Sequence, residues 1–303
     1  MSIKNILLCG LGAVGLTFGA KMLGKCQLKV LVDAKRLENY KKNPPSMNNN
    51  ICDFDYILPS DNYIPDLIII STKADGLESV LEMLPNFVNK DTRIISLING
   101  ISSERIIKER YPDAKVLKSY FIGHSAVREG NEVTQDGVAE IVFEKDNDLD
   151  EFLTKVNIDH SSPDDIDYSM WLKFTLNLFS NQTSAILNMT FGELKNNKTF
   201  TEFAKKIIEE VKAVAEKEGV TGLGNLEKDA FAALERMSDD GKTSMLQDIL
   251  ANRKTEVDIF AGEMIKLGRK HNIPTPYNKV LYDLIKIREE LNEYRIHTGK
   301  GRK

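Results

Sequence analysis

The sequence is poor in cysteine and has no long apolar run, and both absences narrow its class. Its three cysteines, Cys9, Cys26 and Cys52, show no paired spacing. They indicate reduced thiols of a cytoplasmic protein rather than a disulfide framework or a zinc site. No stretch reaches about 18 continuous apolar residues, as a membrane-spanning helix requires. We therefore expect no metal and no membrane partner.

Basic charge is also scarce. The 303 residues carry a net charge of -4, and the only basic cluster is the tail, residues 300–303, which we expect to be a solvated end. Binding to a phosphate backbone requires a basic patch, so we expect no nucleic-acid partner. Residues 1–4 lead directly into a strand pattern, which leaves no room for a signal peptide and again indicates a cytoplasmic protein.

The first half of the chain alternates short apolar runs with amphipathic stretches. The runs are rich in Ile, Leu and Val at successive positions, which is typical of strands buried on both faces of a parallel sheet. They cover residues 3–8, 28–32, 67–70 and 94–98, with helical patterns at 77–84 and 103–110 and further strands expected within 116–143. This alternation predicts a doubly wound α/β domain over residues 1–162.

The pattern changes near residue 160, after which we find no strand signal. Helical periodicities cover residues 168–187, 200–218, 225–237, 253–271 and 278–294. We therefore predict a second, all-α domain over residues 163–303 that contributes the substrate-binding and catalytic side chains.

A GxGxxG motif ends the first strand pattern and opens a helix pattern. It consists of Gly10, Leu11, Gly12, Ala13, Val14 and Gly15. Glycines at this turn let a dinucleotide pyrophosphate approach the backbone N–H groups at a helix N-terminus. The alternative is a glycine-rich turn that binds nothing.

Polar residues also follow three of the other strand patterns. Asp33 can accept hydrogen bonds from the adenosine ribose, which favours NAD, whereas Lys35 and Arg36 could meet a 2′-phosphate. Lys73 and Asn99 follow the next two strands, where open α/β sheets bind their ligands. The alternative for Asp33 and the two basic residues is a solvated turn. For Lys73 it is a helix N-cap region, and for Asn99 it is an Asn-Gly turn.

The segment 168–192 contains one charged residue, Lys173, in an otherwise uncharged helical pattern. Burial disfavours the ammonium form of a lysine, so that its proton can be given up near neutral pH. Asn177 and Asn181 follow at helical spacing and share its face. The stripe suits a small polar substrate. The alternative is a lysine that reaches the surface from a buried helix.

A second polar cluster contains Ser244, which could donate to a carboxylate, and Glu256, which could accept from a substrate hydroxyl or pair with a lysine. By itself, the pattern favours the alternative, a helix N-cap followed by a charged helix face.

These segments together resemble the ketopantoate reductase (2-dehydropantoate 2-reductase) family. The resemblance rests on the glycine motif, Thr72-Lys73-Ala74, Leu97-Ile98-Asn99-Gly100, the Trp171-x-Lys173-x3-Asn177-x3-Asn181 run, Thr243 to Asp248, Thr255 to Asp258, and Pro274 to Asn278. It spans nearly the whole chain and implies a Rossmann domain joined to a helical domain, with hydride transfer from a nicotinamide to the ketone carbon of 2-dehydropantoate.

The resemblance also implies roles for individual residues. Lys173 would be the general acid, and Asn177 and Asn181 would bind the substrate. Ser244 would hold the carboxylate, and Glu256 would meet the terminal hydroxyl or the cofactor. Asn99 would touch both cofactor and substrate, while Lys73 would help to set the cofactor.

The sequence departs from the family at three positions. Asp33 replaces a usual arginine, which puts the family's NADP(H) preference in doubt and makes NAD(H) an alternative; Phe191 and Gln135 replace an asparagine and a histidine. A reductase of another small 2-oxo acid, an opine-type dehydrogenase and a non-catalytic NAD(P)-binding sensor remain alternatives. The expected partner is a small 2-oxo acid, with a homodimer left open.

Overall fold

The computed structural model describes residues 2–123 and 125–298, which divide into two compact units. The first unit runs to Ile166 and the second starts at Asp167, four residues after the start predicted from the sequence. The basic tail at 300–303 lies outside the described residues. No helix in the described ranges is long and apolar enough to cross a membrane.

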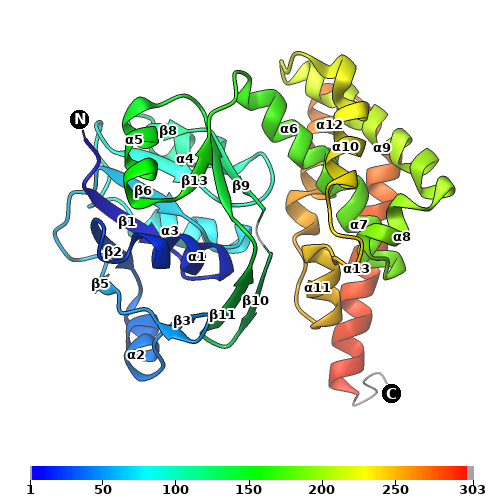
Figure 1. Ribbon diagram of the computed structural model, residues 1–303. Helices are drawn as coiled ribbons and strands as arrows, with labels where there is room; N and C mark the ends of the chain where they lie inside the picture. Colours follow the sequence, from blue (N-terminus) through cyan, green and yellow to red (C-terminus); the bar gives the residue numbers. More distant parts are fainter. Residues whose placement is uncertain (1, 124, 299–303) are drawn as a thin grey trace. The chain divides into compact units, whose positions relative to one another are not determined.

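The first unit is built on a six-stranded parallel sheet (Figure 1). Its order is β5-β2-β1-β6-β7-β8, the order of the Rossmann fold, and every neighbouring pair is parallel. The strands are β1 (Asn5–Cys9), β2 (Gln27–Leu31), β5 (Asp55–Ile57), β6 (Leu67–Ile70), β7 (Arg93–Ser96) and β8 (Lys115–Leu117). All four residues of β6 are buried, as predicted for a strand covered on both faces.

Helices and two small sheets complete this unit. The helices are α1 (Ala13–Met22), α2 (Ala34–Lys42), η1 (Ala74–Gly76), α3 (Leu77–Met83), α4 (Ser103–Arg110) and α5 (Asn147–Val156). One small sheet has the order β10-β11-β3-β4 and the other β13-β12-β9. Their strands are β3 (Ser46–Met47), β4 (Asn50–Ile51), β9 (Ser119–Ile122), β10 (Ser125–Glu129), β11 (Glu132–Asp136), β12 (Glu140–Phe143) and β13 (Asp159–Ser161). The extra strands predicted within 116–143 are thus confirmed, whereas the two-residue strands carried too little pattern to be predicted.

The second unit contains only helices and the loops between them within residues 167–298. It contains α6 (Ile166–Leu176), a π turn η2 (Asn177–Asn181), α7 (Gln182–Leu187), α8 (Phe191–Lys195), α9 (Lys198–Lys217), η3 (Leu223–Asn225), α10 (Leu226–Glu235), α11 (Ser244–Leu250), η4 (Val257–Ile259), α12 (Ala261–His271) and α13 (Pro276–His297). Helix α12 packs against both α9 and α13 (Figure 1). Aromatic rings fill the interior, with Phe179 5.6 Å from Phe231 and 6.0 Å from Phe200 between ring centroids.

One helix predicted from the sequence, at 253–271, is wrong at its start, because residues 253–256 are irregular and only the short 3-10 helix η4 precedes α12. The chain leaves α11 through Asn252, whose φ is +53°, and stays irregular up to η4. The backbone N–H of Thr255 bonds to the side chain of Glu289 instead of to a carbonyl one turn earlier. A partner from a distant helix has here replaced the local helical bond.

The N-terminus of helix α13 is capped by a buried carboxylate from another helix. Its N-cap residue Thr275 makes no side-chain cap, but Glu210 of α9 accepts from the backbone N–H groups of Tyr277 at 2.7 Å and Asn278 at 3.1 Å. Burial raises the pKa of Glu210, and these hydrogen bonds oppose the rise. The negative charge also complements the positive end of the helix dipole.

We expect Glu210→Ala to lower the free energy of unfolding by about 2 kcal/mol, because several helix donors lose a charged acceptor in a buried place. The neighbouring Glu209 is exposed on the same helix, so Glu209→Ala should stay within about 0.5 kcal/mol of wild type. Thermal and denaturant unfolding followed by circular dichroism measures both variants. Equal losses in the two would contradict the capping role.

Candidate active site

The glycine motif forms the turn between β1 and α1, and its first and third glycines are required by close contacts. Gly10 has a φ of +104°, and a Cβ there would lie 2.9 Å from Cγ2 of Thr72. A Cβ on Gly15 would lie 2.0 Å from the carbonyl oxygen of Gly10 and 2.4 Å from Oγ of Ser71. That hydroxyl in turn donates to the Gly10 carbonyl at 2.9 Å. These two glycines therefore let helix and strand pack closely.

The second glycine is different, because the space beside it is open. A Cβ on Gly12 would find its nearest neighbour, the carbonyl oxygen of Ser71, at 3.8 Å. Gly12 is the N-cap of α1, where no side chain caps the helix and no acidic residue occupies the first turn. Leu11 is buried in the core beside it. Open space next to uncapped N–H groups fits a dinucleotide pyrophosphate.

Asp33 follows β2 and is the N-cap of α2. Its Oδ1 accepts from the backbone N–H of Arg36 at 2.7 Å, and its Oδ2 lies 3.3 Å from a guanidinium nitrogen of the same residue. The two side chains are 45% and 57% exposed, so solvent screens this pair. The carboxylate caps α2. It also follows β2, where a Rossmann fold can place an acidic residue for the ribose.

Lys73 and Asn99 lie at the same edge of the sheet as the glycine turn. They follow β6 and β7, and β6 pairs directly with β1 in parallel, so the carboxyl ends of these strands are neighbours. Lys73 is exposed as the N-cap of η1, while Asn99 is half-buried before Gly100, whose φ is +94°. The first unit thus collects every cofactor candidate on one sheet edge, at the switch point between β1 and β6.

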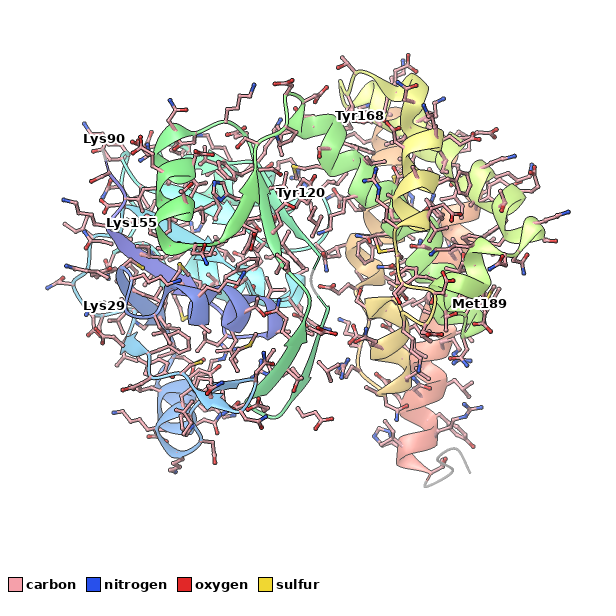
Figure 2. All side chains as sticks on the ribbon, in the orientation of Figure 1. Lys29, Lys90, Tyr120, Lys155, Tyr168 and Met189 are labelled. Atoms are coloured by element: carbon pink, nitrogen blue, oxygen red, sulfur yellow. The ribbon has the colours of Figure 1, made fainter. Side chains whose placement is uncertain are left out.

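In the second unit, the predicted stripe lies on α6 and the π turn that follows it. Asn181 donates from Nδ2 to Oδ1 of Asn177 at 3.4 Å, so the two carboxamides touch. Asn181 is 7% exposed, and Lys173, one turn earlier on α6, is half-buried. Tyr168, labelled on α6 in Figure 2, anchors this helix by donating to Asp229 of α10 at 2.6 Å.

The π turn itself is stabilised by side chains. A π turn departs from the bonding of an α-helix, and such turns are common at functional sites. Ser180 donates to the carbonyl of Leu176 at 2.6 Å, and Gln182 donates to that of Leu178 at 2.7 Å. Both donors are fully buried, so the carbonyls around the turn keep partners where water is excluded. Ser180 and Gln182 therefore stabilise the π turn on which the two asparagines lie.

Ser244 and Glu256 occupy two further helix starts in the same unit. Ser244 is exposed at the first position of α11, but the capping residue is Thr243, whose Oγ1 accepts from the N–H of Leu246 and donates to Ser184 of α7 at 3.1 Å. The α11 N-terminus is thereby fixed to α7. Glu256 is half-buried at the N-cap of η4.

Three residues that hold these candidates in place had no individual role in the prediction from the sequence. Ser71 and Thr72 pack on the glycine turn, and Glu289 of α13 holds Thr255. Ser71 and Thr72 belong to the polar group that follows the strand at 67–70 together with Lys73, so the pattern already placed them near the glycine turn. Glu289 stands in a charged stretch of a long helix, and nothing in that pattern singles it out.

A Rossmann unit followed by a helical unit with a lysine and two carboxamides on one helix defines a nicotinamide-dependent oxidoreductase. Residues 6–148 match the family Ketopantoate reductase PanE/ApbA, and residues 165–289 match Ketopantoate reductase PanE/ApbA C terminal. The chain therefore belongs to the ketopantoate reductase family, which confirms the resemblance seen in the sequence.

Individual relatives agree with this assignment. A 2-dehydropantoate 2-reductase of Shigella flexneri is 30% identical over 78% of this chain and 78% of its own. A solved D-mandelate dehydrogenase in complex with NADH is 25% identical with a TM-score of 0.84, covering 94% of this chain and 99% of the other. A dimeric ketopantoate reductase from Staphylococcus aureus has the same fold, with a TM-score of 0.77 at 20% identity and coverage of 95% and 99%.

The glycine geometry predicts that a methyl group at Gly12 affects cofactor binding, whereas one at Gly15 affects stability. We expect Gly12→Ala to fold with a loss of at most about 1 kcal/mol, because its backbone angles suit alanine and its surroundings are open. We also expect its Kd for NADH to rise at least about tenfold, because the methyl group occupies the pyrophosphate position. Gly15→Ala should instead destabilise the fold by about 1–3 kcal/mol.

Fluorescence titration with NADH and thermal unfolding of both variants measure these effects. Wild-type NADH affinity in Gly12→Ala would show that the dinucleotide does not use this helix end.

Proposed function

We propose that this protein reduces 2-dehydropantoate to pantoate with NAD(P)H, in the biosynthesis of pantothenate and coenzyme A. The observation that carries the proposal is the helix on which Lys173 precedes the touching carboxamides of Asn177 and Asn181. Membership of the family supports the same substrate. A cation and two amides on a largely buried helix suit a small 2-oxo acid, because each can donate to a carbonyl or carboxylate oxygen.

The nicotinamide, when bound, supplies a hydride to the ketone carbon. The carbonyl oxygen gains negative charge as its π bond opens, and Lys173 transfers a proton from Nζ to that oxygen, which completes the hydroxyl. Asn177 and Asn181 orient the ketone, and Ser244 donates to the substrate carboxylate. Glu256 accepts from the terminal hydroxyl, so that it distinguishes 2-dehydropantoate from shorter 2-oxo acids.

The cofactor is held by the first unit. The N–H groups after Gly12 would hold the pyrophosphate, Asn99 would touch both cofactor and substrate, and Lys73 would help to set the cofactor. Since Asp33 stands where the family usually has arginine, we expect NADH to be used at least as well as NADPH. The NADH complex of the related D-mandelate dehydrogenase supports this expectation.

That relative also favours a second candidate, a reductase acting on another 2-oxo acid. The deciding experiment is oxidation of NADH and NADPH against a panel of 2-oxo acids that includes 2-dehydropantoate and the 2-oxo acid of mandelate. We expect 2-dehydropantoate to give the highest kcat/KM. A tenfold or greater advantage for another member of the panel would replace the proposed substrate while leaving the reaction class intact.

We also propose that the protein is a homodimer joined along α13. Val280, Leu284, Ile287 and Tyr294 recur on one face of this helix and are 54%, 40%, 57% and 56% exposed. A continuous exposed apolar stripe is typical of an interaction surface, and a helix stripe can pair with its own copy about a two-fold axis. The dimeric relative from Staphylococcus aureus supports a second copy as the occupant.

We expect Lys173→Ala to lower kcat by about 10²–10⁴-fold, the range typical of a lost general acid. The Kd for NADH should stay within about threefold of wild type, because Lys173 belongs to the helical unit and the glycine turn to the other. Lys198→Ala, at an exposed lysine of the same unit, is the matched control and should leave kcat unchanged. A kcat for Lys173→Ala within about threefold of wild type would remove Lys173 from the mechanism.

The cofactor preference is tested best by Asp33→Ser, because serine retains a helix cap while it removes the charge. Arg36 then loses its carboxylate partner and becomes available to a 2′-phosphate. We expect the ratio of kcat/KM for NADPH to that for NADH to rise about tenfold, and further in Asp33→Arg. A wild-type protein that already prefers NADPH a hundredfold, with no change in either variant, would show that Asp33 does not read the ribose.

The dimer is tested by Ile287→Glu, which places a charge at the centre of the apolar stripe. We expect this variant to elute as a monomer in size-exclusion chromatography with light scattering at concentrations where the wild type is a dimer. Ile64→Glu, at an isolated isoleucine that is 71% exposed in the other unit, should remain dimeric. A wild-type monomer, or a dimer unaffected by Ile287→Glu, would exclude this interface.

A further inference from the structure

The segment that carries Glu256 belongs to no helix or strand. Helix α11 ends at Leu250 and η4 begins at Val257, and residues 253–256 between them are irregular. Its first residue is hydrogen-bonded to α11, because the N–H of Arg253 donates to the carbonyl of Asp248 at 2.8 Å. The position of Glu256 therefore depends on bonds that come from outside the segment.

Glu289 of α13 supplies such bonds. Its Oε1 accepts from the backbone N–H of Thr255 at 2.7 Å and from the Thr255 hydroxyl at 2.7 Å. The hydroxyl oxygen then accepts from the N–H of Val257 at 3.3 Å, so a single carboxylate oxygen fixes both flanks of Glu256. The Glu289 side chain is only 11% exposed, and Thr255 is buried, which shields these bonds from water.

Two neighbours on the same face of α13 make hydrogen bonds to Glu289 and to η4, which follows the segment. Lys286 donates to Oε2 of Glu289 at 3.3 Å and to Asp258 at 2.9 Å, and Tyr282 donates to Asp258 at 2.9 Å. Although burial opposes it, these hydrogen bonds keep the pKa of Asp258 below its usual value. Tyr282, Lys286 and Glu289 stand four and three residues apart, which places them on the side of the helix opposite the apolar stripe.

We propose that Glu289 is a positioning residue for substrate specificity, fixing Thr255 so that Glu256 meets the terminal hydroxyl of the substrate. This inference rests on the proposed function of Glu256. The relevant chemistry of Glu289 is acceptance at one oxygen, because both bonds to Thr255 end on Oε1. A glutamine amide retains such an oxygen, whereas alanine removes it.

The test compares Glu289→Gln with Glu289→Ala on two substrates, 2-dehydropantoate and the same 2-oxo acid without its terminal hydroxyl. We expect Glu289→Ala to raise the KM for 2-dehydropantoate about tenfold, with the KM for NADH unchanged and less than threefold change for the substrate lacking the hydroxyl. Glu289→Gln should remain within about twofold of wild type, since it keeps both bonds. Glu290→Ala is the control at an exposed glutamate beside it.

A second readout does not depend on turnover. Hydrogen exchange of the peptide covering residues 252–258 should quicken in Glu289→Ala and stay at the wild-type rate in Glu289→Gln. Unchanged exchange in Glu289→Ala overturns the proposal, as does faster exchange with equal losses on both substrates. Glu256→Ala in the same assay separates the two hypotheses: if it shows no hydroxyl-selective loss, the role proposed for Glu256 fails, whereas a selective loss in Glu256→Ala alone refutes only the role of Glu289.

Discussion

The structure depends on one constraint, that backbone polar groups removed from water must find partners. In the helical unit, side chains from distant elements often supply them. Glu210 of α9 accepts from the first N–H groups of α13, and Glu289 of α13 accepts from Thr255. The first of these bonds fixes the start of α13, and the second fixes the irregular segment before η4. At Gly12 the N-terminus of α1 has no side-chain cap, and the space beside it is open, so its donors suit an anionic ligand.

The two units bring their candidate residues together in different ways, because one is built on a parallel sheet and the other on helices. A parallel sheet places the carboxyl ends of all its strands at one edge, which is why a glycine turn, a lysine and an asparagine from distant parts of the chain gather there. A helix instead places residues one turn apart side by side, and the amide of Asn181 reaches that of Asn177 across the π turn. The first arrangement suits an extended dinucleotide and the second a compact substrate.

Much of this could be predicted from periodicity. The strand at 67–70 and the helix at 103–110 were predicted with the bounds that β6 and α4 have, because buried parallel strands and amphipathic helices leave clear patterns. The helix predicted from 253 was wrong, since the polar run there has helical spacing but its backbone bonds to Glu289. The π turn carried no signal in the pattern, because this helix is buried on most sides and has no single apolar face whose shift would reveal the extra residue.

The sequence by itself determined the two-part plan, the glycine turn before α1 and the lone lysine on an uncharged helix, because these follow from local spacing and composition. Only the tertiary structure decided that Thr243 rather than Ser244 caps α11, that Asp33 also caps α2, and that Glu289 holds Thr255. The physical reason is that a hydrogen bond requires atoms within about 3 Å. Thr255 and Glu289 are 34 positions apart in the chain, and they reach that distance only because the segment before η4 packs against α13.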